Sequence, residues 1–406
     1  MKAFLILEDG TVFTGTHIGV DKEIISEIVF NTSMAGYPEV LTDPSYAGQA
    51  VCMTYPLIGN YGICRADLES RQAWPDGLIV RELSRTASNF RSNLTIQEFL
   101  MEQDVPGIEG IDTRELTKIL REKGTMNGMI TTDEDYDLSE IIPRLKAYTT
   151  GKVVEKVTCP KKYFVKGSGS LEENAPLSGS ARFEEAEYAA YRGGDHTKEE
   201  RKPSLVRELN GTGLKVALLD LGAKYNIARS LAERGCDVTI YPASTPAAEI
   251  IADAPDGIML SNGPGDPKEC TSVIEQISIL YGTDIPIFAI CLGHQLMALA
   301  TGADTYKLKY GHRGGNHPVK DLSDGRVYIT SQNHGYVVDM EKLDPKISKP
   351  AFVNVNDGTN EGLSYLGKDI FTVQFHPEAC PGPQDSRYLF DKFISMMKEK
   401  GGKTNA

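Results

Sequence analysis

The sequence predicts an α/β protein whose C-terminal half contains a doubly wound, mostly parallel sheet and whose N-terminal half is a β-rich α+β domain. The first observation is that, from residue 214 onward, short apolar segments alternate with helical segments of about ten residues, which is typical of such sheets. The second is a series of strand signals in the first 60 residues. The third is the polar, Gly- and Ser-rich composition between the two halves. We therefore expect domains over 1–158 and 213–406, joined by a linker over 159–212.

The composition of the 406 residues is that of an ordinary soluble globular protein, with 40% hydrophobic and 24% charged residues. The formal net charge of −13 argues against nucleic acid or an anionic membrane as the main partner. No apolar run reaches transmembrane length, and Glu8 and Asp9 cut the apolar start too short for a secretory signal. The seven Cys are scattered without a CxxC pair, which indicates neither zinc nor disulfides, so we expect a cytoplasmic protein.

The first 60 residues predict strands around a hairpin, followed by one long loop. Glu8-Asp9-Gly10 is a hairpin signal between two short apolar segments. The expected strands cover residues 4–7, 11–13, 29–31 and 50–54. Residues 34–49 (MAGYPEVLTDPSYAGQ) are dense in Gly, Pro, Asp and Ser and predict a long ordered loop. A plain surface loop and a binding loop are equally consistent with this composition.

The rest of the N-terminal half predicts helices. They are expected over residues 94–104, 112–123 and 137–148. Asp112 with Glu115 three residues later predicts a capping box, and Gly124 predicts the end of that helix before another strand. Pro143 would strain the third helix or begin it. Inside the linker, residues 181–191 favour one or two helical turns. This half carries no recognisable catalytic constellation.

The C-terminal half predicts strands and helices in alternation. The expected strands cover residues 214–222, 236–243, 257–260 and 285–290. The expected helices between them cover residues 226–235, 244–254 and 271–282. Continuous apolar strands of this kind are typical of a parallel sheet that is buried on both faces. No GxGxxG or P-loop motif opens these units, so they predict no dinucleotide or ATP site.

Cys291 stands where the last of these strands turns directly into a helix over residues 292–300. This is the geometry of a nucleophile elbow, and Ala289 and Gly293 supply the small side chains that such a turn needs. The helix N-terminus would favour the thiolate by lowering the thiol pKa from its ordinary value of about 8.5, and its N–H groups can stabilise an oxyanion. The alternative is a buried structural cysteine, which most free cysteines are.

Two further segments follow strands of the same predicted sheet. Residues 261–267 (SNGPGDP) come after one strand, and the apolar segment 371–375 ends at His376, with Glu378 two residues later. Ligands of open α/β sheets bind at the carboxyl ends of the strands, so both segments are expected to converge on Cys291. In isolation, the Gly-rich segment indicates only a sharp turn, and a single His is more often structural than catalytic.

The roles follow from the chemistry of a cysteine nucleophile, which needs a base and an orienting group for that base. His376 can take the thiol proton and return it to a leaving amine, while Glu378 holds the imidazole in one tautomer. The N–H groups of Leu292 and Gly263 can form an oxyanion hole. Other histidines compete, but none has a carboxylate two residues on at a strand end. They are His294, expected to point away from the thiol, His312 and His317, expected to flank a Gly-rich loop, and His334, expected in a turn.

The segments FAICLGHQ and VQFHPE together resemble the class I, or triad, glutamine amidotransferases. The segments LDLGAKYNI, SNGPGDP, YGHRGGNHPV and SQNHGY narrow the resemblance to the small, glutamine-hydrolysing subunit of carbamoyl phosphate synthase. In the N-terminal half, NTSMAGYPEVLTDPSYAGQ, GNYG and GIDTRELTKILREKGTMNG are similar to the amino-terminal domain of that subunit, which other amidotransferases lack. The resemblance covers the chain except for roughly residues 160–212.

The resemblance implies Cys291 as the nucleophile, His376 as the base and Glu378 as the group that orients it. It also implies that L-glutamine is bound by Ser45, Gly263, Gly265, Leu292, Gln295, Asn333, Gly335 and Tyr336. Ala289 stands where the family usually has Gly, so its methyl group must fit against the elbow. Tyr336 stands where Phe is also common, which matters little if the backbone makes the contact.

The resemblance further implies a partner, the large subunit of carbamoyl phosphate synthase, which uses bicarbonate, ATP and metal ions. This chain is then expected to hold no cofactor and no metal of its own. The segment GHRGGNHPV and the N-terminal domain are candidate contact surfaces for the large subunit. The sequence leaves open whether the product feeds pyrimidine or arginine biosynthesis.

Three alternatives stay open. The chain can be the glutaminase subunit of another synthetase, of the anthranilate or GMP type, against which the dedicated N-terminal domain argues. It can be a regulatory scaffold without activity, against which the intact set of Cys291, His376 and Glu378 argues. It can be a cysteine hydrolase of another substrate, which the SQNHGY and SNGPGDP segments disfavour.

Overall fold

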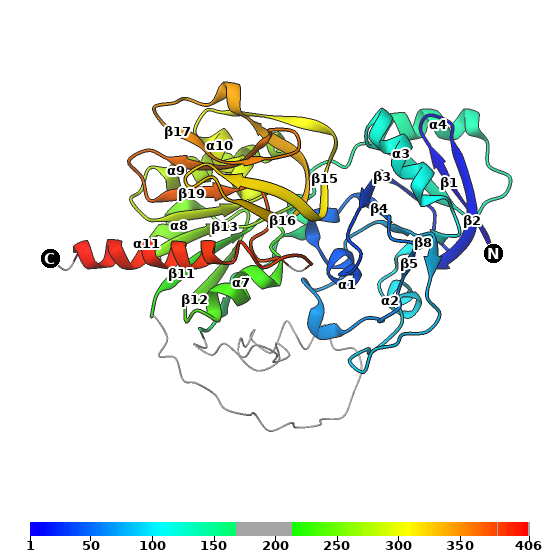
Figure 1. Cartoon of the computed structure of the whole chain (residues 1–406), viewed down its shortest axis with the longest axis horizontal. Coiled ribbons are helices and arrows are strands. Elements are labelled where there is room, and N and C mark those ends of the chain that lie inside the picture. Colours follow the sequence, from blue (N-terminus) through cyan, green and yellow to red (C-terminus); the bar gives the residue numbers. More distant parts are fainter. Residues whose placement is uncertain (168–212, 380, 405–406) are drawn as a thin grey trace.

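The computed structural model describes residues 1–167, 213–379 and 381–404. Figure 1 shows two lobes side by side, one from the N-terminal half and one from the C-terminal half. A closed barrel forms the first lobe, and a ten-stranded sheet covered by helices forms the second. The chain is therefore a mixed α/β protein.

The barrel follows the strand order β1-β2-β8-β6-β4-β3-β9. Its strands are β1 (Lys2–Leu7), β2 (Val12–Gly19), β3 (Ile24–Asn31), β4 (Gln49–Met53), β6 (Gly77–Ile79), β8 (Pro106–Glu109) and β9 (Met126–Thr131). A separate parallel pair consists of β5 (Leu57–Ile58) and β7 (Glu82–Leu83). Alternate residues of β1 lie in different core clusters, Leu5 with Leu120 of α3 (Thr113–Lys123) and Ile6 with Leu145 of α4 (Leu138–Ala147). Burial on both faces explains why β1 is apolar from Ala3 to Leu7.

The caps of the N-terminal helices differ from the prediction. The complete capping box is in α2 (Ile96–Glu102), where Thr95 and Glu98 each accept from the other's backbone N–H. In α3, Asp112 accepts from the N–H of Glu115 at 2.9 Å, but the Glu115 carboxylate lies 3.3 Å from Lys118 instead of reaching back. The predicted capping box at α3 is therefore only half formed, since the carboxylate has a cation as an alternative partner.

Three segments of the N-terminal half contain a proline within or at the start of a helix. Helix α4 begins after Asp137, whose side chain accepts from Ser139, and it runs through Pro143 rather than beginning there. A last short helix, α5 (Val154–Val157), leads toward the second lobe. The predicted loop 34–49 is wrong in part, because it contains helix α1 (Tyr37–Leu41) and a 3₁₀ turn over Pro44–Tyr46. Both begin with a proline in the first turn, where its missing N–H costs no hydrogen bond.

The sheet of the second lobe has the order β10-β12-β11-β13-β14-β19-β18-β17-β15-β16. Its strands are β10 (Tyr163–Val165), β11 (Lys215–Asp220), β12 (Asp237–Pro242), β13 (Gly257–Leu260), β14 (Ile287–Ile290), β15 (Asp304–Asp321), β16 (Val327–Asp339), β17 (Ser348–Asn354), β18 (Asn360–Tyr365) and β19 (Ile370–Val373). The five central strands from β12 to β19 are parallel to their neighbours, whereas every pairing on either side of them is antiparallel. The expectation of a mostly parallel sheet is therefore wrong, because β15 with β16, β17 with β18 and β18 with β19 form antiparallel pairs of consecutive strands, and β17 also pairs antiparallel with β15.

The long hairpin of β15 and β16 replaces two predicted turns. His312, His317 and His334 all lie within these strands, not in the expected Gly-rich loop and turn. The pairing shifts register between Lys307 and His312, and again before His317. Gly311 has a φ of +70° at the first shift, a conformation that glycine adopts without strain. The glycines therefore mark bulges within a strand and not a break between strands.

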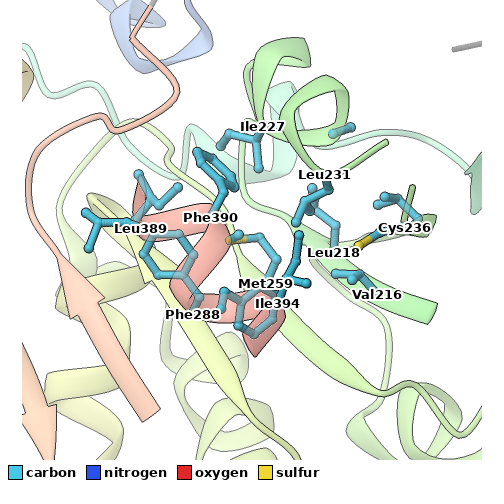
Figure 2. Packing of buried hydrophobic residues seen from close by; sticks show 14 of the residues in the cluster. Val216, Leu218, Ile227, Leu231, Cys236, Met259, Phe288, Leu389, Phe390 and Ile394 are labelled. Atoms are coloured by element: carbon cyan, nitrogen blue, oxygen red, sulfur yellow. The ribbon is translucent and has the colours of Figure 1, made fainter. Parts of the chain in front are cut away.

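Helices cover both faces of the parallel strands. They are α7 (Tyr225–Ala232), α8 (Ala247–Ala252), α9 (Thr271–Tyr281), α10 (Leu292–Ala300) and α11 (Tyr388–Thr404). Figure 2 shows one face, where Leu218 and Phe288 of the sheet pack against Leu231 of α7 and Phe390 of α11. On the other face, Leu219 shares a core cluster with residues of α8, α9 and α10. Alternate residues of β11 thus serve two cores, as a doubly wound sheet requires.

The segment expected to be a linker begins inside the sheet. Strand β10, over Tyr163–Val165, pairs antiparallel with β12. Residues 168–212, with the helical turns expected over 181–191, lie outside the described residues. Among the helices that the structure describes, none combines the length and the apolar character that crossing a membrane would need.

Candidate active site

Cys291 occupies a strained turn between β14 and α10. Its φ of 51° and ψ of −106° are unusual for a residue with a side chain, and such strain is concentrated at functional sites. The turn is held because Cys291 N–H donates to Val373 O at 2.8 Å and Gly293 N–H donates to Ser261 O at 3.0 Å. Ala289, fully buried in β14, fits its methyl group into the core between the sheet and its helices.

Gly293 is needed for the close approach of α10 to the sheet. A Cβ atom at this position would lie 2.6 Å from Leu260 O and 2.8 Å from Leu260 Cβ. We expect Gly293→Ala to destabilise the fold by about 1–3 kcal/mol through overpacking against backbone. The matched control is Gly335→Ala, whose Cβ meets nothing nearer than Arg313 Nη2 at 3.5 Å. Thermal unfolding measures both, and equal midpoints for the two variants would contradict the steric argument.

His376 and Glu378 lie at the end of the strand next to the elbow. Strand β19 pairs in parallel with β14, and His376 follows it by three residues. His376 N–H donates to Ser331 O at 2.9 Å, which fixes the backbone of the segment. The Nδ1 atom lies 2.6 Å from Glu378 Oε1, and Nε2 has no hydrogen-bond partner among the described residues. This arrangement leaves Nε2 available for proton transfer.

Lys224, which the sequence did not identify as a site residue, forms an ion pair with Glu378. Its Nζ lies 2.7 Å from Glu378 Oε1 and donates to Ala379 O at 3.0 Å, and all of these groups are buried. Burial alone would raise the pKa of Glu378, but Lys224 and His376 beside it lower this pKa to about 2. Glu378 is therefore a carboxylate at neutral pH. The only sequence signal was one Lys at the strand-to-helix turn of LDLGAKYNI.

The protonation state of Cys291 differs from the sequence-based expectation. Burial raises the pKa of the Cys291 thiol, and the nearby carboxylates of Asp43 and Glu378 raise it further, against Lys224. The thiol lies 3.7 Å from Asn333 O as a donor. Burial thus outweighs the helix N-terminus in this site, so the resting group is a thiol and a base is needed to activate it.

A cavity of about 280 Å³ lies beside the thiol, between the two lobes. This volume is close to that of small-molecule sites, which start at about 300 Å³. Of the residues predicted from sequence, those that line it are Ser45, Gly263, Gly265, Cys291, Gln295, Asn333, Gly335 and Tyr336. Leu292 is buried behind the elbow, and His376 and Glu378 also lie outside the lining set.

Both lobes build the walls of this cavity. Asn262 Nδ2 of the second lobe donates to Ser45 Oγ at 3.0 Å, and Asn333 Nδ2 donates to Asp43 Oδ2 at 2.9 Å. Asp43 in turn accepts from Ser45 N–H at 2.9 Å, as the cap of the 3₁₀ turn. The predicted loop 34–49 therefore closes the cavity from across the interface through its own short helical turns.

The surroundings of the thiol include the backbone of Leu292 and Gly263 and the side-chain amide of Gln295. Leu292 is the first residue of α10, so its N–H has no acceptor within the helix. A Cβ at Gly263 would lie 2.8 Å from Leu292 Cδ2, so the two segments are in contact. Gln295 Nε2 donates to Tyr336 O at 2.8 Å and to Gln374 Oε1 at 3.0 Å, which fixes the Gln295 side chain where it lines the cavity.

The cavity is also lined by charged side chains that sequence reasoning missed. Glu27 of β3 is 2.6 Å from Lys307 of β15, and both line the cavity together with Arg313. Burial would raise the pKa of Glu27, but the two cations lower it. No motif marks these residues, because they meet only when the two lobes are joined.

The competing histidines have structural partners. His294 Nδ1 is 2.7 Å from Thr372 Oγ1, and burial lowers the pKa of His294 to about 3. His312 Nε2 is 2.9 Å from Asp357; burial would lower its pKa, but Asp357 and Glu361 raise it to about 9. His334 lines the cavity, and its Nδ1 is held 2.9 Å from Tyr336 O.

One buried group has the donor types of a metal site. His312, His334 and Glu361 bring possible ligand atoms within 4.8 Å of one another. Both Glu361 oxygens already accept hydrogen bonds, from Gln332 Nε2 at 2.8 Å and Asn354 Nδ2 at 2.9 Å. These hydrogen bonds make the three residues part of a buried polar network.

Comparisons with known proteins identify the family of the chain. Residues 217–396 match the family described as glutamine amidotransferase class-I, and residues 5–130 match the CPSase domain of the carbamoyl-phosphate synthase small chain. The carbamoyl phosphate synthase small chain of Listeria monocytogenes is 45% identical over 402 residues, which cover 98% of each chain. That of Clostridium perfringens is 46% identical over 394 residues, 97% of this chain and 99% of the relative. The chain therefore belongs to the family of carbamoyl phosphate synthase small chains.

Proposed function

We propose that this chain hydrolyses L-glutamine to glutamate and ammonia and supplies the ammonia to a separate large subunit for carbamoyl phosphate synthesis. The observation that carries the proposal is the strained Cys291 elbow, whose strand pairs directly with the strand that leads to His376 and Glu378. The polar cavity beside the thiol has a volume suited to an amino acid. The relatives named carbamoyl phosphate synthase small chain support the same activity.

The first half of the reaction forms a thioester. His376 Nε2 takes the proton of the Cys291 thiol as sulfur attacks the carbon of the glutamine side-chain amide. The N–H groups of Leu292 and Gly263 hold the oxyanion, a contribution of about 3 kcal/mol for each donor. His376 then gives its proton to the departing nitrogen, which leaves as ammonia. Glu378 holds the imidazole by its Nδ1 side throughout.

The second half regenerates the thiol. His376 takes a proton from water as the water oxygen attacks the glutamyl thioester carbon, and the C–S bond breaks to release glutamate. The proton returns from His376 to the Cys291 sulfur. The remaining predicted residues, Ser45, Gly265, Gln295, Asn333, Gly335 and Tyr336, hold the substrate in the cavity that they line.

The partner follows from the same proposal. Ammonia is easily lost to water, so a synthetase gains by receiving it from a bound glutaminase. The large subunit uses ATP, metal ions and bicarbonate, while this chain needs no cofactor and no metal of its own. A cytoplasmic location, expected from the scattered cysteines, belongs to the proposal as well.

The testing experiment measures glutamate release by the purified chain, alone and with a carbamoyl phosphate synthase large subunit, ATP and bicarbonate. We expect strong stimulation by the large subunit and formation of carbamoyl phosphate. Hydrolysis that ignores this partner would contradict the assigned synthetase, and the anthranilate- and GMP-type alternatives would then be tested. No hydrolysis in either mixture would overturn the proposal in favour of a scaffold.

Covalent labelling gives an independent prediction. A glutamine analogue with an electrophilic side chain is expected to modify Cys291 selectively, because Cys291 is the only cysteine of residues 1–167, 213–379 and 381–404 that lines the cavity. L-glutamine is expected to protect the thiol in proportion to its occupancy, and peptide mass spectrometry locates the label. Labelling that is spread over several cysteines, or that glutamine does not block, would contradict a glutamine site.

A further inference from the structure

Glu69, a residue of the N-terminal lobe, caps a helix of the other lobe. It is 1% exposed and faces the first turn of α7 across the interface. Tyr225 N–H donates to Glu69 O at 2.7 Å, and Asn226 N–H donates to Glu69 Oε2 at 3.0 Å. Lys224, at the N-cap position of α7, makes no capping bond with its own side chain. Glu69 thus does from another lobe what an N-cap residue usually does within the helix.

The capped turn is also the one that holds the general base's partner. Lys224 Nζ lies 2.7 Å from Glu378 Oε1, and Asn226 Nδ2 donates to Glu378 O. Asn226 itself carries one of the two N–H groups that Glu69 accepts, and Lys224 immediately precedes Tyr225, which carries the other. A short chain of direct contacts therefore runs from Glu69 through the start of α7 to Glu378, and from there to His376.

The other side of Glu69 is tied to the wall of the cavity. Glu69 N–H donates to Thr42 Oγ1 at 2.9 Å, and Ser70 Oγ donates to Thr42 O at 2.6 Å. Thr42 immediately precedes Asp43 and the 3₁₀ turn that carries Ser45 into the cavity. The segment around Glu69 therefore contacts both Thr42, next to the turn that carries Ser45, and the first turn of α7.

A cation makes this buried carboxylate tolerable. Arg229 of α7 places Nη1 3.3 Å from Glu69 Oε1 and donates from Nη2 to Leu68 O at 3.3 Å. Burial raises the pKa of Glu69 to about 7, and Arg229 and Lys224 oppose this rise. The hydrogen-bond and ion-pair partners of its side chain both come from α7, and its backbone N–H is held by Thr42.

We propose that Glu69 is a positioning residue for glutamine hydrolysis, which fixes the first turn of α7 so that Lys224 and Asn226 hold Glu378 in line with His376. The inference rests on the proposed function and adds to it a dependence of the triad on the N-terminal lobe. Glu69 does not touch the substrate, since it is absent from the cavity lining. Its loss should therefore change the rate of chemistry more than the binding of glutamine.

The test compares Glu69→Ala with Glu69→Gln in the complete complex with the large subunit. Glu69→Ala is expected to lower kcat for glutamine about 10- to 100-fold, since small displacements of catalytic groups cost about that much, with KM within about threefold of native. Glu69→Gln keeps an acceptor for the Asn226 N–H and is expected to recover most of the lost kcat. The matched control is Glu102→Ala, which removes an exposed carboxylate of the same lobe paired with Arg65 at 2.8 Å and should leave kcat unchanged.

A double-mutant cycle separates positioning from general destabilisation. If Glu69 acts through the start of α7, the losses in kcat from Glu69→Ala and Lys224→Met should be strongly non-additive. Additive losses, a native kcat in Glu69→Ala, or a loss in Glu69→Gln as large as in Glu69→Ala would each overturn the inference. Ammonia-dependent synthesis by the same complexes should be unchanged, which shows that the lobes still assemble. A native complex without glutaminase activity would instead refute the proposed function, and the inference with it.

Discussion

Cys291→Ala is expected to lower glutamine hydrolysis by at least about 10⁴-fold, because removal of the nucleophile of a triad leaves only binding and oxyanion stabilisation. The complex of this variant with the large subunit should still make carbamoyl phosphate from added ammonia at the native rate. The loss is specific because Cys291 provides the only thiol that lines the cavity among the described residues. Glutamate release and carbamoyl phosphate formation are measured in parallel, with glutamine or ammonia as the nitrogen source.

The matched control for this variant is Cys64→Ala. Cys64 is a buried thiol of the N-terminal lobe that lies outside the cavity lining, so both activities should stay native. Glutaminase activity retained in Cys291→Ala would contradict the nucleophile assignment. Loss of the ammonia-dependent activity together with hydrolysis would show that the substitution disturbs the complex and not only the thiol chemistry.

The features that could be predicted from the sequence are those whose residues are adjacent in the chain. The elbow at Cys291 could be predicted because the strand, the nucleophile and the helix are adjacent in the chain. The strands β11 and β14 are likewise marked by their own continuous apolar segments. The antiparallel strands β15 and β16 were missed because their glycines resemble turn signals. In the sheet, these glycines lie at β-bulges within the pair of strands.

Contacts between distant segments could not be predicted from such signals. Lys224 contacts Glu378 across 154 positions of the chain, and nothing in its neighbourhood marks a buried cation. The same holds for Glu27 with Lys307, which meet only at the interface of the two lobes. The state of the Cys291 thiol was predicted in the wrong direction, because a local argument from the helix N-terminus takes no account of burial or of Asp43.

Several contacts around the cavity and around Glu378 cross the interface between the two lobes. Asp43 and Ser45 reach the substrate wall, and Glu69 reaches the helix turn that supports the triad. The N-terminal lobe therefore contributes directly to the cavity and to the contacts around Glu378.

The last prediction concerns His376, which we expect to contribute a factor of about 10²–10⁴ to kcat as the general base and acid, equal to about 3–5 kcal/mol of transition-state stabilisation. Because burial and neighbouring carboxylates keep Cys291 a thiol, His376→Asn removes the group that can accept its proton. The expected result is a kcat lowered by that factor, with ammonia-dependent synthesis unchanged. Labelling of Cys291 by iodoacetamide should slow in the same variant, because fewer thiolates form.

The control is His17→Gln, in a half-buried position of β2 where the ring only bonds Val20 O, and it should leave kcat native. His334 is the competing base, since it is the one histidine among the described residues that lines the cavity. Burial and the cationic His312 beside it lower the pKa of His334 well below its ordinary value, which makes it a poor acceptor for a thiol proton. A native kcat in His376→Asn combined with a 10²-fold or larger loss in His334→Asn, the range expected for a general base, would transfer the role to His334. A loss in His376→Asn with a native kcat in His334→Asn would assign proton transfer to His376.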